Sequence, residues 1–152
     1  GGRVADFMAA RRGQQWLPWV VALSSLMALP LLYLTFMAQT PMAAIAAYAL
    51  PAMFGTLYVA PGFALIQNST PLEMRSVAAA INLFITNIIG LGLGPFSVGL
   101  FSDLFAQSYG ADGLRWGLTT TIIILLWGVF HYWRCGVMIK RQFADALSPQ
   151  RV

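Results

Sequence analysis

The chain has 152 residues, of which 59% are hydrophobic and only 9% are charged. Soluble domains carry roughly 25% charged residues, so this composition argues against a water-soluble globular domain and indicates helices that lie in a lipid bilayer. The net charge of +4 does not indicate nucleic-acid binding, because the basic residues lie between apolar stretches, where they orient membrane proteins. We therefore expect membrane lipids as partners and no nucleic acid.

Three stretches contain no Asp, Glu, Lys or Arg: residues 13–72, 76–102 and 116–133. A bilayer core of about 30 Å needs roughly 20 apolar residues per helix. The first stretch is long enough for two helices, and each of the others fits one. The sequence therefore predicts an all-α integral membrane protein. Its four transmembrane helices are expected at about residues 16–38, 42–66, 72–104 and 114–138.

Residues 1–15 are expected to form a cytoplasmic loop, and residues 139–152 a cytoplasmic amphipathic tail that lies along the membrane surface. Only Arg115 lies on the opposite side of the predicted membrane. The basic residues on the first side are Arg3, Arg11, Arg12, Arg75, Arg134, Lys140, Arg141 and Arg151. The positive-inside rule then places both ends of the chain in the cytoplasm. Aromatic residues at the predicted span ends agree with an interfacial belt; they are Trp16, Trp19, Tyr132 and Trp133 inside and Trp116 outside.

No motif of a soluble enzyme occurs in the sequence. There is no glycine-rich phosphate loop after a strand, no metal-ligand cluster and no nucleophile elbow. We therefore expect no catalytic residue, no metal and no cofactor, and we predict that the protein is not an enzyme.

The chain opens with Gly2-Arg-Val-Ala-Asp6 and continues to Arg11-Arg12-Gly13. This segment resembles the loop signature of major facilitator superfamily transporters, in which an Asp and an Arg form a latch that holds the cytoplasmic side closed. The resemblance assigns this latch to Asp6, Arg11 and Arg12. Phe7 stands where a basic residue is usual, and the basic pair comes one position late. The alternative is a loop whose positive charge serves only to orient the chain.

The third predicted span carries Gly90, Gly94 and Gly99 along roughly one side of the helix, which allows backbones to approach closely. Pro95 is expected to bend the same helix. The pattern of Gly, three residues, Gly-Pro, three residues and Gly is similar to the antiporter signature in the fifth helix of the superfamily. Its pseudo-symmetric counterpart is the eleventh helix. The alternative is a tight packing face without a mechanistic role.

The order of the two motifs resembles helices nine to twelve, the last third of a twelve-helix major facilitator fold. The segment that starts at Pro71-Leu-Glu-Met-Arg75, together with Asn87 and the glycines, looks most like the spinster branch, whose members move lysophospholipids and sphingoid lipids. The resemblance implies a secondary active transporter in the bacterial inner membrane. It would move such an amphipathic lipid, or another hydrophobic small molecule, by alternating access. The remaining N-terminal helices of the same transporter are expected before Gly1.

In this family the tenth and eleventh helices line the central cavity, and the ninth and twelfth face lipid. The resemblance therefore implies substrate-cavity residues on the second and third spans. These are Tyr48, Thr56, Tyr58, Asn82, Thr86 and Asn87. For each of them, hydrogen bonding between helices is the alternative. The alternative function is a self-contained four-helix membrane subunit, or a small multidrug-type exporter that oligomerises.

Overall fold

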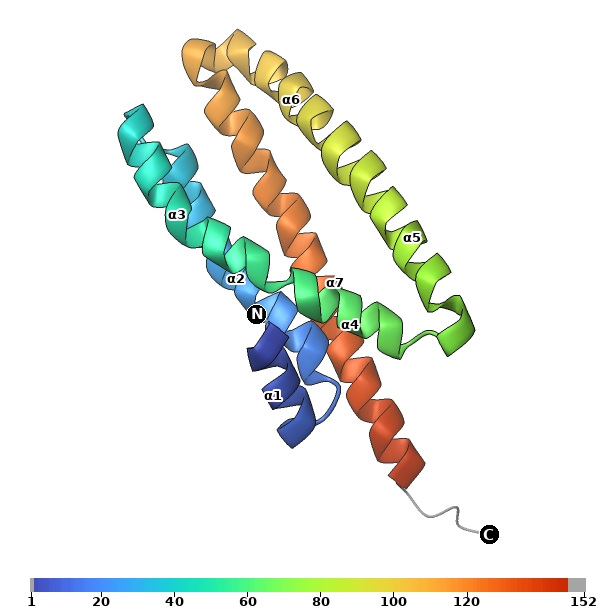
Figure 1. The fold of residues 1–152 in the computed structure, drawn as a ribbon. Helices are drawn as coiled ribbons and strands as arrows, with labels where there is room; N and C mark the ends of the chain where they lie inside the picture. Colours follow the sequence, from blue (N-terminus) through green and yellow to red (C-terminus); the bar gives the residue numbers. More distant parts are fainter. Residues whose placement is uncertain (1, 148–152) are drawn as a thin grey trace.

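The computed structural model describes residues 2–147, and every regular element within this range is helical. Figure 1 shows long helices that run side by side, with α7 between α6 and the hairpin formed by α2 and α3. The elements are α1 (Gly2–Arg12), α2 (Trp16–Phe36), α3 (Pro41–Leu57), α4 (Val59–Asn68), η1 (Leu72–Met74), α5 (Arg75–Ile85), η2 (Thr86–Leu93), α6 (Gly94–Tyr109), η3 (Gly110–Asp112) and α7 (Gly113–Leu147).

The most buried helix is α2, because it packs against both α3 and α7. Its residues Leu17 and Val21 are among the most completely buried side chains of the described chain. A short turn leads into α3, where the Thr40 hydroxyl accepts a hydrogen bond from the backbone N–H of Ala43 at 3.3 Å. The Thr40 hydroxyl thus pairs with a backbone N–H that has no partner within the helix, and Pro41 in the first turn has no N–H that needs one.

The predicted second span contains Pro51 and Pro61, and it is divided into α3 and α4 at Tyr58. Pro61 has no backbone N–H, so the carbonyl of Leu57 has no partner four residues later. The helical bonding resumes beyond the break, where the N–H of Gly62 donates to the carbonyl of Tyr58 at 2.9 Å.

The third and fourth predicted spans form one continuous helical stretch of 73 residues, from Leu72 to Ala144. The described chain therefore has three uninterrupted stretches that are long and apolar enough to cross a membrane. The third stretch reverses direction at Gly110, whose φ of 55° is a conformation that favours glycine. The single helical turn η3 fills the reversal, so α6 and α7 run antiparallel (Figure 1). The third stretch thus contains two long runs of helix, α6 and α7, where the sequence predicted two separate spans.

Both ends of the chain differ from the predicted loop and tail. Residues 2–12 form helix α1, which ends at Gly13 with a φ of 100° and a hydrogen bond from its N–H to the carbonyl of Ala9 at 3.0 Å. The methyl group of Ala5 is completely buried because α1 docks against α2 and α4. The loop prediction failed because the motif that carries the charges is also compatible with a helix.

At the other end, α7 continues through the predicted tail to Leu147 without a break. No proline or glycine separates Met138 from Leu147, so nothing ends the helix there. At 1.5 Å per residue, a helix of 35 residues is about 52 Å long, which exceeds a bilayer core of about 30 Å. The tail extends the helix axis up to Leu147, and positions 148–152 lie outside the described residues.

Two glycines that were not among the predicted packing residues allow the backbones of α6 and α7 to approach closely. Gly113 and Gly117 are buried at the start of α7, and they are spaced four residues apart. A Cβ atom at Gly113 would lie 2.7 Å from the carbonyl oxygen of Ser102 on α6, and one at Gly117 would lie 2.8 Å from its backbone nitrogen. The GxxxG spacing was the signal that could have identified this contact.

Candidate functional site

A hollow of about 330 Å³ lies between α4, α5 and α7. Three of the six predicted substrate-cavity residues line it, namely Tyr58, Asn82 and Thr86. Its wall is otherwise mainly apolar, with one further polar side chain, Tyr132 of α7. The remaining lining residues are Val59, Gly62, Phe63, Leu65, Ile66 and Leu83.

The break in the second span positions the hollow. Tyr58 lies at the junction of α3 and α4, so its side chain is at the point where the helix axis changes direction. Gly62 follows one turn later, and a Cβ atom there would lie 4.0 Å from the hydroxyl of Tyr132. Gly62 and the hydroxyl of Tyr132 therefore lie on facing sides of the hollow.

Asn82 and Thr86 occupy successive turns, with Asn82 at half-buried depth on α5 and Thr86 exposed at the start of η2. Within residues 2–147, the side chains of Asn82, Thr86, Tyr58 and Tyr132 form no hydrogen bond with one another or with a neighbour. Their donors and acceptors are thus available to a ligand. Such a wall, apolar with a few polar groups, is typical of small-molecule sites.

The other three predicted cavity residues do not line this hollow. The side chain of Tyr48 is 53% exposed on α3. The hydroxyl of Thr56 donates to the carbonyl of Met53 at 2.8 Å, and the side-chain amide of Asn87 donates to the carbonyl of Leu83 at 2.7 Å. Tyr132, in contrast, was assigned to the interfacial belt, and no pattern in the sequence indicated that it faces α4.

The residues of the predicted latch do not pair with one another. Asp6, Arg11 and Arg12 are all exposed on α1. The guanidinium of Arg11 lies 4.4 Å from the ring centre of Phe7, and that of Arg12 lies 5.5 Å from a ring of Trp16. Within the described part of the chain these three residues form no ion pair.

The predicted packing glycines face open space within this chain. A Cβ atom at Gly99 would meet no atom within 4 Å, and one at Gly94 would meet only the carbonyl oxygen of Ile89, at 3.9 Å. A Cβ atom at Gly90 would similarly meet only a methyl group of Thr86, at 4.0 Å. Any close helix packing along this face would therefore involve a partner other than residues 2–147.

The eight residues before Gly94 form the π-helical segment η2. Pro95 follows directly, and its missing N–H cannot pair with the carbonyl of Leu91. The N–H of Gly94 donates to the carbonyl of Ile89, five residues back, which is the π-helical pattern. Short π segments are frequent at functional sites because they can change their hydrogen bonding, so this part of the helix is a candidate point of bending.

The chain is similar to a protein of Mycolicibacterium smegmatis that is named an MFS-type efflux pump, where MFS denotes the major facilitator superfamily. The two are 34% identical over 145 residues, which is 95% of this chain and 33% of the relative. The chain spans about a third of the length of the curated relative that it matches. No family model matches the chain, and no solved structure matches it.

The described chain is all-α and has stretches long and apolar enough to cross a membrane, in agreement with the predicted fold class. The name of the relative specifies export but neither a substrate nor a branch of the superfamily. The class of the transported ligand is therefore inferred from the residues that line the hollow at Asn82.

Proposed function

We propose that the chain forms helices nine to twelve of a major facilitator transporter, which moves a hydrophobic or amphipathic small molecule by alternating access. The observation that carries the proposal is the hollow in which Tyr58, Asn82, Thr86 and Tyr132 meet on an apolar wall. The similarity to an MFS-type efflux pump over 95% of the chain supports it. Because transporter sites form between structural repeats, the hollow would be one wall of a cavity completed by other helices.

The chemistry of the hollow favours an uncharged or amphipathic ligand. No Asp, Glu, Lys, Arg or His is among its lining residues, so it offers hydrogen bonds from hydroxyl and amide groups but no counter-ion. A lysophospholipid or sphingoid base has hydroxyl groups beside a long hydrocarbon chain, and the resemblance to the spinster branch favours this class. The name of the relative supports movement out of the cell.

The mechanism requires a part of the structure that can change shape. In this proposal, η2 and Pro95 let the helix bend between the inward-open and outward-open states. Gly90, Gly94 and Gly99 then pack against the remaining helices in one of those states. Asp6, Arg11 and Arg12 on α1 would hold the cytoplasmic side closed by contact with the same remaining helices.

A transport measurement tests this function. The intact protein is reconstituted into liposomes, and the flux of a fluorescent lysophospholipid, a fluorescent sphingosine and the cationic dye ethidium is followed with and without an imposed pH gradient. We expect one of the two lipids to cross faster than in protein-free liposomes. Flux at the protein-free rate for all three probes would overturn the proposal. Equal flux from the isolated 152-residue chain would instead support a self-contained exporter.

A further inference from the structure

A second, larger groove lies between α4 and α7, and it adjoins the hollow at Asn82, with which it shares Leu65 and Ile66. It consists of two adjoining parts of about 700 and 590 Å³, which share Leu65, Ser69, Ile139 and Gln142. Because the two parts have these four residues in common, they form one continuous groove, called here the α4–α7 groove. Neither the relative's name nor the proposed transport function assigns a role to it.

The two parts of the α4–α7 groove differ in chemistry. One part is mainly apolar, with Leu65, Phe130 and Met138 among its lining residues. The polar groups include Arg134 in the first part and Arg75 in the second, and no Asp or Glu lines either part. The groove therefore offers positive charge next to apolar surface, without an acidic side chain to neutralise it.

The positions of the two arginines are partly fixed by the protein. The guanidinium of Arg134 lies 5.9 Å from the ring centre of Phe130, which holds it over the apolar wall. The Nε of Arg75 donates to the carbonyl of Thr70 at 3.3 Å, at the turn before α5. Among the side chains that the structure describes, neither arginine forms an ion pair.

The groove lies next to tryptophans of the predicted inner aromatic belt, because Arg134, which lines it, is the neighbour of Trp133. Trp133 directly precedes Arg134 in α7. The ring of Trp19 stacks on that of Trp133, with ring centres 5.4 Å apart. The indole N–H of Trp19 also donates to the carbonyl of Trp133 at 3.3 Å. Tryptophan gathers at the level of lipid headgroups, so Arg134 is expected at the headgroup level of the same leaflet.

We propose that the α4–α7 groove binds an anionic phospholipid of the cytoplasmic leaflet as a resident lipid, distinct from the transported molecule. The arginines pair with the headgroup phosphate, and an acyl chain lies along Leu65, Phe130 and Met138. Basic pockets between helices on the cytoplasmic side attract anionic headgroups in this way. A soluble anion would leave the apolar wall uncovered. The leaflet, but not the groove, rests on the orientation proposed from the positive-inside rule.

Binding to the intact purified protein in neutral detergent tests this assignment by native mass spectrometry. The probes are dioleoyl phosphatidylglycerol, dioleoyl phosphatidylcholine and glycerol phosphate. We expect tighter binding of phosphatidylglycerol than of phosphatidylcholine, and little binding of glycerol phosphate. Arg134→Gln and Arg75→Gln should each weaken phosphatidylglycerol binding about fivefold, since one basic group near an anionic lipid contributes about 1 kcal/mol.

Arg141→Gln is the matched control, because Arg141 is exposed on the same helix as Arg134 and does not line the groove. Its phosphatidylglycerol binding should equal that of the unmodified protein. An equal loss in Arg141→Gln, or no loss in Arg134→Gln and Arg75→Gln, would overturn the proposal. So would binding of glycerol phosphate as tight as that of the lipid. Asn82→Ala should leave phosphatidylglycerol binding unchanged, so a failure of the transport proposal remains distinguishable from a failure here.

Discussion

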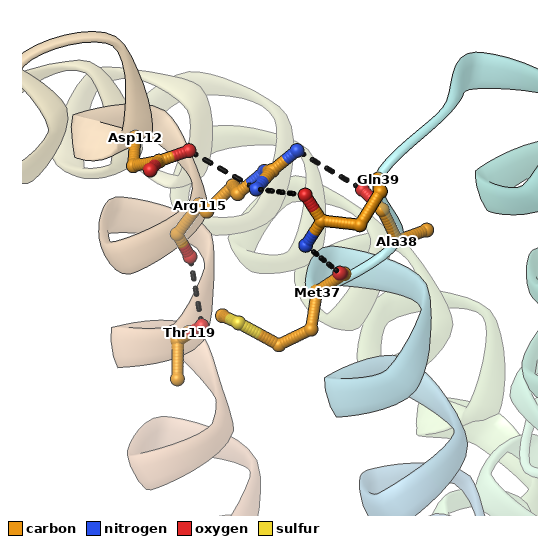
Figure 2. Close-up of polar contacts among 6 residues, drawn as sticks. All are labelled: Met37, Ala38, Gln39, Asp112, Arg115 and Thr119. Carbon is orange, nitrogen blue, oxygen red and sulfur yellow. Dashed lines mark hydrogen bonds and ion pairs between the residues drawn. The ribbon is translucent and has the colours of Figure 1, made fainter.

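Arg115 at the start of α7 donates a hydrogen bond from Nη2 to the carbonyl oxygen of Ala38, just after α2, at 3.1 Å (Figure 2). Its Nη1 lies 3.4 Å from Oε1 of Gln39 and 3.0 Å from Oδ1 of Asp112. Carbonyls at the C-terminal end of a helix lack helical partners and form the negative end of its dipole. The only basic residue predicted outside thus joins the first hairpin to the turn before α7.

Replacing Arg115 should destabilise the protein more than replacing its acidic partner. Arg115→Ala removes charge-assisted hydrogen bonds, and we expect it to lower the free energy of unfolding by roughly 1–3 kcal/mol. Asp112→Asn should cost less than about 1 kcal/mol, because the Asp112 side chain is 58% exposed and exposed ion pairs contribute little. Unfolding in mixed detergent micelles, followed by circular dichroism, measures both. An equal loss in the two variants would contradict this assignment.

The contact between Gly117 and α6 gives a second prediction about stability. Gly117→Ala places a methyl group against backbone atoms of Val98 and Ser102, at 3.0 and 2.8 Å, so the two helices must separate. Overpacking of this kind costs roughly 1–3 kcal/mol, measurable by the same unfolding experiment. Gly128→Ala on the same helix is the control, because a Cβ there would meet nothing within 4 Å. That variant should be neutral or slightly stabilised, since alanine favours helix by about 1 kcal/mol over glycine.

The sequence predicted the helical class because this class depends on local composition. Stretches without charge are sufficient to indicate membrane helices. The helix over Gly2–Arg12 was not predictable in this way. Ala5 of this helix is buried against α2 and α4. This is a tertiary contact, which cannot be inferred from a local sequence pattern.

The candidate site was predicted only in part, for a related reason. Asn82 and Thr86 both line the hollow, but the sequence gave no information on which residues of α7 approach them. Tyr132 joins the hollow because α7 lies beside α4 there. Thr56 and Asn87 were equally polar candidates, yet both side chains bond to their own helix. Distinguishing such residues requires the relative positions of three helices.

The orientation of the chain can be measured by cysteine accessibility. In a Cys135→Ser background, Ser108→Cys on α6 and Ala144→Cys on α7 are both exposed positions. The positive-inside rule places Ser108 outside and Ala144 in the cytoplasm. An impermeant maleimide added to intact cells should therefore label the first variant and not the second until the cells are lysed. The opposite pattern of labelling would reverse the proposed topology.

Gly94 should affect the rate of transport more than the affinity for substrate. Gly94→Leu meets open space within this chain, so the protein should still insert and fold. If Gly94 packs against the remaining helices in one state of the transport cycle, a leucine there disfavours that state. We expect the turnover rate in liposomes to fall several-fold, with the dissociation constant changing by less. Gly128→Leu is the control on α7, and an equal reduction in that variant would show a general effect of added bulk.

The last prediction concerns the hollow, and it separates ligand contact from helix packing. Asn82→Ala and Thr86→Ala should each weaken substrate binding up to roughly tenfold, because one hydrogen bond contributes about 0.5–1.5 kcal/mol and 1.4 kcal/mol is one decade. Asn87→Ala, at the residue after Thr86, is the matched control. The amide of Asn87 donates a hydrogen bond to the carbonyl of Leu83, and the residue does not line the hollow. Binding isotherms of the fluorescent lysophospholipid and sphingosine provide the measurement. If Asn87→Ala weakens binding and the other two variants bind normally, the substrate contacts a different face of this helix.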